Sequence, residues 1–226
     1  MVGLLVVDKP LGWSSMDVVR RVRGAAGGVK TGHAGTLDPL ATGVVVCCLG
    51  KATRCVEQIM GQRKTYEADV DLSAWSTTDD REGELQPVEV PTPPTREQVA
   101  AACEQFVGDI EQVPPAHSAM RVGGRRAYKL ARQGQEVVLE PRIVSIYAIE
   151  LTGYTWPTAT LTVHCGRGTY IRSLARDLGK ALGTGGHLAA LRRTAVGPYT
   201  LAQAVTVEHC KEVGVTEADL LPMPEQ

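Results

Sequence analysis

The chain has 226 residues, 43% of them hydrophobic and 22% charged, with a formal net charge of −1. These values are ordinary for a globular protein, and the sequence contains no internal repeat or low-complexity segment. It also contains no apolar run long enough to span a membrane and no charged-then-apolar signal sequence, so we expect a cytoplasmic protein.

Charge is distributed unevenly along the chain. Acidic residues dominate between Glu67 and Glu111, whereas Arg and Lys dominate in 121–132 and 167–193. Such segregation can form a basic face on a nearly neutral protein, and that face can hold a polyanion. The six cysteines form no C-x-x-C motif and do not pair with histidines at zinc-finger spacing. Buried reduced thiols are therefore expected, and no metal site.

In chain order, the first half predicts strands from apolar or alternating runs and helices from capping residues. The predicted strands cover 3–8, 44–49 and 64–72. The predicted helices are one capped by Ser14 or Ser15, one over 51–60, and one over 96–107 capped by Thr95. The acidic, proline-rich stretch 76–94 between the last strand and the last helix predicts a loop.

The second half begins with a basic, glycine-containing segment, 120–140, with a short helix expected over 128–132. Antiparallel strands are predicted over 137–139, 143–151 and 159–165. Helices are predicted over 170–182, over 187–191 and once in the tail. Because strands and helices mix without regular βαβ alternation, the sequence predicts an α+β fold.

One stretch, Gly32–Gly43, stands out as a place for chemistry. It has three glycines and Pro39, so it predicts a tight loop, and an apolar strand follows it. His33 and Asp38 are polar groups that this stiff loop would hold beside a rigid strand. Taken alone, the pattern is also that of an ordinary turn with a solvated Asp.

Three further features are each weak evidence for a functional site when taken alone. Arg172 lies at a helix start after a glycine loop, where it can hold a carboxylate or phosphate or simply face solvent. Tyr66 on its strand is either a core residue or a stacking platform for a base. The cations of 121–132 form either a solvated surface or, with Tyr128, a nucleic-acid contact.

Read in order, these motifs resemble the TruB family, the bacterial tRNA pseudouridine synthases. The resemblance covers nearly the whole chain in collinear order and is most specific in the central twelve residues. The matching motifs are Val7–Ser15, Gly32–Gly43, Lys64–Tyr66, Thr77–Gly83, Gln112–Pro115, Ala127–Gly134, Gly168–Arg172 and Leu191–Arg193.

The resemblance implies that uridine 55 in the T-loop of tRNA is converted to pseudouridine, without a metal or organic cofactor. It also implies the pseudouridine synthase fold, a mixed, mostly antiparallel central sheet flanked by helices. We expect a single catalytic domain over 1–226, with a mobile basic thumb at 120–140 that clamps the RNA and a short tail at 208–226. The binding partner would be the T-arm of tRNA, with no obligate protein partner and a monomeric enzyme.

The family pattern also assigns roles to residues. Asp38 would be the essential catalytic residue, Arg172 would pair with it, and Tyr66 would stack on the target base and is a candidate to take the sugar proton. His33 would occupy space in the opened loop of the RNA. The other implied substrate- or RNA-binding positions are Tyr170, Leu191, Lys9, Asp80, Arg125, Arg126 and Lys129.

Two departures from the family pattern occur. His117 stands where a Tyr or Phe is common, and the chain stops where most relatives continue into a PUA domain, which predicts weaker contacts to the acceptor end. Two alternative functions are considered for the same motifs. One is a guide-RNA-dependent pseudouridine synthase, and the other is an RNA chaperone that refolds tRNA and for which catalysis is dispensable.

Overall fold

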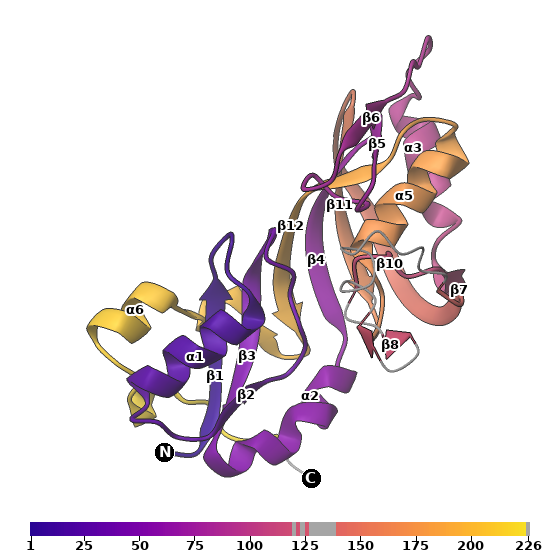
Figure 1. The fold of residues 1–226 in the computed structure, drawn as a ribbon. Helices are drawn as coiled ribbons and strands as arrows, with labels where there is room; N and C mark the ends of the chain where they lie inside the picture. Colours follow the sequence, from indigo (N-terminus) through magenta and orange to yellow (C-terminus); the bar gives the residue numbers. More distant parts are fainter. Residues whose placement is uncertain (119–120, 123–124, 127–138, 225–226) are drawn as a thin grey trace. The chain divides into compact units, whose positions relative to one another are not determined.

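The computed structural model describes residues 1–118, 121–122, 125–126 and 139–224. The chain divides into two compact units (Figure 1): unit 1 comprises 1–67 and 191–226, and unit 2 comprises 68–190. The chain passes between them within two strands, β4 (Lys64–Asp71) and β12 (His187–Val196). Each unit is described by itself below.

In unit 1, strands lie in the order β14 (Val205–Thr206), β1 (Gly3–Lys9), β3 (Ala41–Leu49) and β12. β1 is antiparallel to β3 along its whole length, from Gly3 opposite Leu49 to Lys9 opposite Gly43. The other edge of β3 is shared between β2 (Thr31–His33), which pairs with its end, and β12, which runs parallel to its start. A short β13 (Tyr199–Thr200) borders β12. The strand β3 is therefore the centre of the unit 1 core.

Helices of unit 1 begin where the sequence supplies a cap. α1 (Ser15–Ala25) starts with a capping box between Ser14 and Asp17 and buries Val18, Val19 and Val22. It contacts α6 (Val207–Glu212) and β3 (Figure 1). A 3₁₀ turn (Gly50–Cys55) leads into α2 (Val56–Gly61), and further 3₁₀ turns cover Leu201–Gln203 and Glu217–Asp219.

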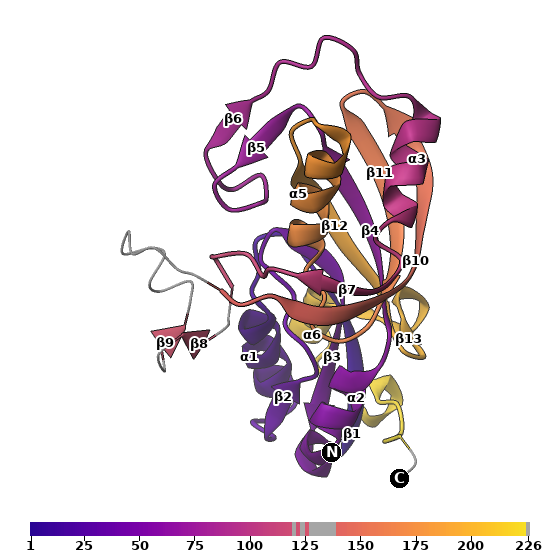
Figure 2. The same ribbon diagram turned by 90° about the vertical axis from the view of Figure 1, so that its right-hand side faces the viewer.

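In unit 2, the strands follow the order β4, β11 (Thr158–Cys165), β10 (Arg142–Thr155) and β7 (Gly108–Gln112). β10 is antiparallel to both β11 and β7. The helices α3 (Arg96–Glu104) and α5 (Ile171–Leu182) contact each other, and α3 packs on β10 (Figure 2). Two small hairpins complete the unit, β5 (Ala74–Ser76) with β6 (Leu85–Pro87) and β8 (Arg121–Val122) with β9 (Arg125–Arg126).

The predicted α+β class with a mostly antiparallel sheet and flanking helices is confirmed. So are the strands predicted at 3–8, 44–49, 64–72, 143–151 and 159–165 and the helix over 170–182, each shifted by only a few residues. Ser14 and Thr95 cap their helices as expected, and Gly183 ends α5 with a left-handed φ of 67°. The sequence patterns behind these correct predictions all involve residues that are close to one another in the chain.

The helix predicted over 187–191 is wrong, because these residues form the start of β12. The backbone of Leu188 pairs with that of Asp79 and Asp80, and Leu191 lies opposite Ala41 of β3. Pairing with two distant segments thus overrides the local helix propensity of an Ala- and Leu-rich stretch. The loop predicted over 76–94 begins at the last residue of β5 and contains the strand β6, and β7 was not predicted.

The predicted thumb over 120–140 lies mostly outside the described residues, as do the helix over 128–132 and most of the strand over 137–139. All six cysteines are unbridged thiols, and burial raises the pKa of Cys48 to about 12 and that of Cys103 to about 11. Such thiols are protonated and unreactive near neutral pH. Among the described residues, no helix has the length and apolar character needed to cross a membrane.

Candidate active site

Asp38 lies half-buried in the loop 34–40 that connects β2 to β3. The hydroxyl of Ser15 holds the preceding residue twice: the Leu37 N–H donates to Ser15 Oγ at 2.8 Å, and Ser15 Oγ donates to the Leu37 carbonyl at 3.1 Å. On the other side, the Ala41 N–H donates to the carbonyl of Asp38 at 3.0 Å. The backbone is therefore fixed immediately before and after the carboxylate.

Lys9 supports the same loop from β1. Its side chain is fully buried, and Nζ donates to the carbonyls of Trp13 (2.7 Å), Pro10 (3.0 Å) and Pro39 (3.5 Å). The Pro39 carbonyl also accepts the Gly12 N–H at 2.8 Å. Burial lowers the pKa of Lys9 to about 8, although the negative charge of Asp38 acts in the opposite direction. Lys9 thus places a buried cation beside the loop of Asp38.

Arg193 of β12 is a second buried cation, only 1% exposed. Its Nε donates to the Val44 carbonyl at 2.7 Å, and its two terminal nitrogens donate to the Thr36 and Gly35 carbonyls at 3.2 Å each. The strands come this close because residue 43 is glycine: a Cβ at Gly43 would lie 2.2 Å from the Arg193 carbonyl oxygen. Arg193 therefore ties the loop to β3.

The remaining predicted site residues of unit 1 are His33, Tyr66 and Leu191. His33 lies on β2, and burial followed by the charge of Arg193 lowers the pKa of its imidazole, which favours the neutral form. Tyr66 is buried on β4, 9% exposed. Leu191 is half-buried opposite Ala41, where the loop joins β3.

In unit 2, Arg172 is the second residue of α5 and is buried. Nη1 donates to Asp80 Oδ2 at 3.3 Å and to the Thr78 carbonyl at 3.4 Å, and Nη2 donates to the His117 carbonyl at 3.1 Å. Asp80 is 2% exposed, and its Oδ1 accepts from Thr78 Oγ1 at 2.6 Å and from the Glu82 N–H at 3.0 Å. The pair is thus buried and well supplied with hydrogen bonds.

A second ion pair lies one helical turn further along α5. Arg176 Nη1 donates to Asp79 Oδ2 at 2.8 Å, and both side chains are 16% exposed. Burial raises the pKa of the Asp79 carboxyl, while Arg176 opposes that shift. At the start of α5, the side chain of the buried Gln112 binds the backbone of Tyr170. The Tyr170 N–H donates to Gln112 Oε1 at 2.8 Å, and Gln112 Nε2 donates to the Tyr170 carbonyl at 3.1 Å.

The predicted residues fall into two groups. In unit 1, Lys9 contacts the Asp38 loop, and in unit 2, Arg172 pairs with Asp80, while Gln112 holds the backbone of Tyr170 two residues before Arg172. Asp38 and Arg172 belong to different units, so their pairing stays a prediction. Further predicted RNA-binding residues lie in the thumb: Arg125 and Arg126 are described only through the strand β9, and Lys129 lies outside the described residues.

Sequence reasoning missed three residues that position the site: Arg193, Gln112 and Ser15. Arg193 and Gln112 occurred in motifs but received no role. Ser15 was considered only as a helix cap, yet Ser14 caps α1 and Ser15 anchors Leu37. Within the described part of the chain, no three His, Cys, Asp or Glu side chains cluster to form a metal site.

Comparison with known proteins places these residues in a family context. The family model for the N-terminal domain of TruB family pseudouridylate synthases matches residues 20–171. The model for the C-terminal domain of tRNA pseudouridylate synthase B matches residues 172–221.

Several curated relatives of this chain are named tRNA pseudouridine synthase B. The one from Arthrobacter sp. strain FB24 is 50% identical over 216 residues, which cover 93% of this chain and 71% of the relative. The one from Thermobifida fusca strain YX is 46% identical and covers 99% of this chain and 78% of the relative.

Among solved structures, a Cbf5–Nop10–Gar1 complex contains a chain that is similar with a TM-score of 0.74 and 30% identity. The alignment covers 98% of this chain, which spans 60% of the length of that chain. A structure of an H/ACA RNP bound to a substrate RNA is similar at a TM-score of 0.70 and 29% identity, over 98% of this chain and 59% of that one. The two matched models together span almost the full sequence, and the chain belongs to the TruB family of pseudouridylate synthases.

Proposed function

We propose that this protein isomerises uridine to pseudouridine in tRNA, at position 55 of the T-loop, with Asp38 as the catalytic residue. The observation that carries the proposal is the carboxylate of Asp38 on a loop anchored by Ser15, Lys9 and Arg193, in a chain of the TruB family. Relatives that match 93% or more of this chain bear the name tRNA pseudouridine synthase B.

The reaction breaks the N1–C1′ glycosidic bond, turns the uracil over and forms a C5–C1′ bond. The proton that leaves C5 is balanced by the proton that N1 gains, so no oxidant, reductant or second substrate is consumed. An ionised carboxylate suits this chemistry because it can attack C1′ or support deprotonation of the sugar. Both routes use Asp38 in the same place.

The residues of unit 1 that surround Asp38 would contribute by holding its carboxylate in position before the substrate binds. The backbone of the loop is held on both sides of Asp38, so the carboxylate needs little rearrangement to meet the sugar. A uridine must leave its stack to reach the carboxylate, which costs a few kcal/mol, on the order of 2–4. Tyr66 would offset this cost by stacking on the flipped base, and it is the candidate to take the sugar proton.

The other roles are assigned by position. Arg172 would pair with Asp38 and keep it ionised, while Asp80 holds the guanidinium in place. Tyr170 and Leu191 would line the pocket for the uracil, and His33 would fill space in the opened T-loop. Each of these roles follows the family motif at the same position of this sequence.

Binding of the T-arm would also use the basic thumb over 120–140, in which Arg125, Arg126 and Lys129 would meet phosphates. We further propose that the protein acts as a monomer in the cytoplasm, as a single domain without a cofactor or an obligate protein partner. The purified protein would then be active by itself.

The test measures tritium release from 5-tritiated uridine in a T-arm RNA, with the product mapped to its nucleotide. The purified parent should release tritium at position 55, and Asp38→Asn should lower the rate by about 10³-fold or more while RNA binding persists. Asp109→Asn, which neutralises an exposed carboxylate on β7, is the matched control and should react like the parent.

Equal release by Asp38→Asn and the parent would exclude Asp38 as the catalytic residue. A parent that binds and refolds tRNA but releases no tritium would instead be an RNA chaperone. A parent that reacts only when a guide RNA is added would belong with the guide-dependent synthases.

A further inference from the structure

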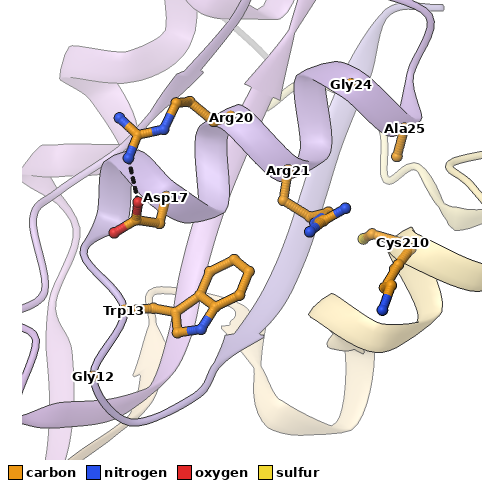
Figure 3. A pocket seen from close by; sticks show the side chains of 9 residues that line it. Gly12, Trp13, Asp17, Arg20, Arg21, Gly24, Ala25 and Cys210 are labelled. Atoms are coloured by element: carbon orange, nitrogen blue, oxygen red, sulfur yellow. Dashed lines mark hydrogen bonds and ion pairs between the residues drawn. The ribbon is translucent and has the colours of Figure 1, made fainter.

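A groove of about 710 Å³ lies in unit 1 between α1 and α6, and we call it the α1–α6 groove (Figure 3). The residues that line it are Gly12, Trp13, Asp17, Arg20, Arg21, Gly24, Ala25, Cys210 and Lys211. We propose that this groove binds the sugar-phosphate backbone of the tRNA, as a contact separate from the thumb. The inference rests on the proposed function, since it takes tRNA as the substrate.

One end of the groove is joined to the loop of Asp38. The Gly12 N–H donates to the Pro39 carbonyl at 2.8 Å, and Lys9 Nζ, which also reaches Pro39, donates to the Trp13 carbonyl at 2.7 Å. The Gly12–Trp13 turn is therefore shared by the groove and the catalytic loop. An RNA strand in the groove would therefore contact the turn that supports the loop of Asp38.

The charges in the groove favour an anion. Asp17 is its one carboxylate, and it accepts hydrogen bonds from the Ser14 N–H at 2.9 Å and Ser14 Oγ at 2.5 Å and pairs with Arg20 (Figure 3). The bonds from Ser14 lower the pKa of Asp17, so its charge is present and already compensated. Among the described residues, no carboxylate forms an ion pair with Arg21 or Lys211. Two positive charges thus remain for a ligand.

The form of the groove fits a polymer better than a single small anion. Arg21 and Lys211 line it and are exposed, so each would contribute one weak, salt-dependent phosphate contact. Trp13 is half-buried and lines the groove together with Arg20, Arg21 and Lys211, so the lining combines an aromatic side chain with cations. Cations interleaved with an aromatic and apolar surface are typical of a nucleic-acid contact.

The glycine of α1 provides a way to obstruct the groove without disturbing the fold. A Cβ at Gly24 would meet no atom within 4 Å, and Gly24 has no positive φ. Gly24→Glu therefore adds a carboxylate to the groove at a helical position that tolerates a side chain. Gly61 at the end of α2 has the same properties and does not line the groove, so Gly61→Glu is the matched control.

The experiment measures the Kd of a full-length tRNA transcript as a function of salt concentration. Arg21→Gln/Lys211→Gln should reduce the slope of log Kd against log salt by about 2, one unit for each lost phosphate contact. The control Lys51→Gln/Arg54→Gln removes two exposed cations of unit 1 outside the groove and should keep the parent slope. Gly24→Glu should weaken binding about tenfold at low salt, and Gly61→Glu should not.

Groove variants that bind with the parent slope and Kd would overturn the inference, as would equal losses in the groove variants and their controls. Tritium release by the parent is measured in parallel. If the parent releases tritium and the groove variants bind normally, this inference fails and the proposed function stands. If the parent neither binds tRNA nor releases tritium, both fail.

Discussion

The loop that carries Asp38 and the helix start that carries Arg172 are both held by buried charges, but of opposite sign. In unit 1 the buried cations Lys9 and Arg193 donate to backbone carbonyls of the loop. In unit 2 the buried carboxylate of Asp80 accepts from the side chain of Arg172 itself. The first arrangement fixes the path of a backbone, and the second fixes the direction of one side chain.

This difference affects how much stability a substitution should remove in each unit. A cation that is solvated by carbonyls leaves several unsatisfied acceptors when it is removed, because carbonyls cannot reorient within a closed loop. Removing the carboxylate of a buried pair leaves the guanidinium charge uncompensated, but the Thr78 and His117 carbonyls still accept hydrogen bonds from Arg172. We therefore expect larger losses in unit 1 than in unit 2.

The largest effect is expected for Arg193→Met. Losing its hydrogen bonds to Val44, Thr36 and Gly35 should lower the free energy of unfolding by about 3–5 kcal/mol and reduce tritium release in the folded protein. The control is its neighbour: Arg192 is 37% exposed and pairs with Asp8, so Arg192→Met should cost under about 1 kcal/mol. Urea unfolding followed by circular dichroism measures both, and equal losses would contradict the contrast.

A smaller loss is expected for Asp80→Asn, which leaves the buried guanidinium of Arg172 without its carboxylate. The free energy of unfolding should fall by about 2–3 kcal/mol, less than for a buried pair without other partners, because Arg172 keeps its hydrogen bonds to the Thr78 and His117 carbonyls. Asp79→Asn provides the comparison, because burial raises the pKa of Asp79 and the folded state therefore disfavours its charge. The stability linked to this group is largest when it is protonated and falls as pH rises through its folded pKa, so a neutral Asn should cost under about 1 kcal/mol.

Urea unfolding at neutral pH would show the order of these two variants. Asn also suits the positive φ of 60° at residue 79, so the backbone is not a source of loss. A larger loss for Asp79→Asn than for Asp80→Asn would mean that the pair with Arg176, not the pair with Arg172, stabilises the start of α5.

The smallest effect concerns pH and Lys9. Its folded pKa of about 8 lies below the 10.5 of an exposed lysine, so between these values the unfolded chain binds more protons. This group alone therefore makes the folded state more stable as pH rises through that window. The neutral amine nevertheless binds carbonyls less strongly, by about 1 kcal/mol, so tritium release should fall about fivefold above pH about 8 without unfolding.

The variant Lys9→Arg tests whether deprotonation of Lys9 causes the fall in tritium release, because a guanidinium keeps its charge between pH about 8 and 10.5. Its profile of tritium release against pH should lack the fall near pH 8 that the parent shows. A fall of the same size in both proteins would assign the effect to another group.

Helices and strands could be predicted from the sequence where the pattern that specifies them involves residues only a few positions apart. Ser14 with Asp17 and Thr95 with Gln98 form capping boxes, and Gly183 ends α5. The alternation of β4 likewise needs no partner to be recognised. The helix predicted over 187–191 failed because β12 is specified by its pairing with β3 and with Asp79–Asp80, which lie about 100 or more residues away.

The central motif indicated the family and predicted Asp38 as the catalytic residue from the sequence alone, but the tertiary structure decided how this residue is held. Lys9 reaches Pro39 across 30 residues of sequence, and Arg193 reaches Thr36 across 157. Both donate to carbonyls, which every residue possesses, so no residue type in the loop signals their partners. Only folding, which buries these cations beside that backbone, selects the carbonyls that they bind.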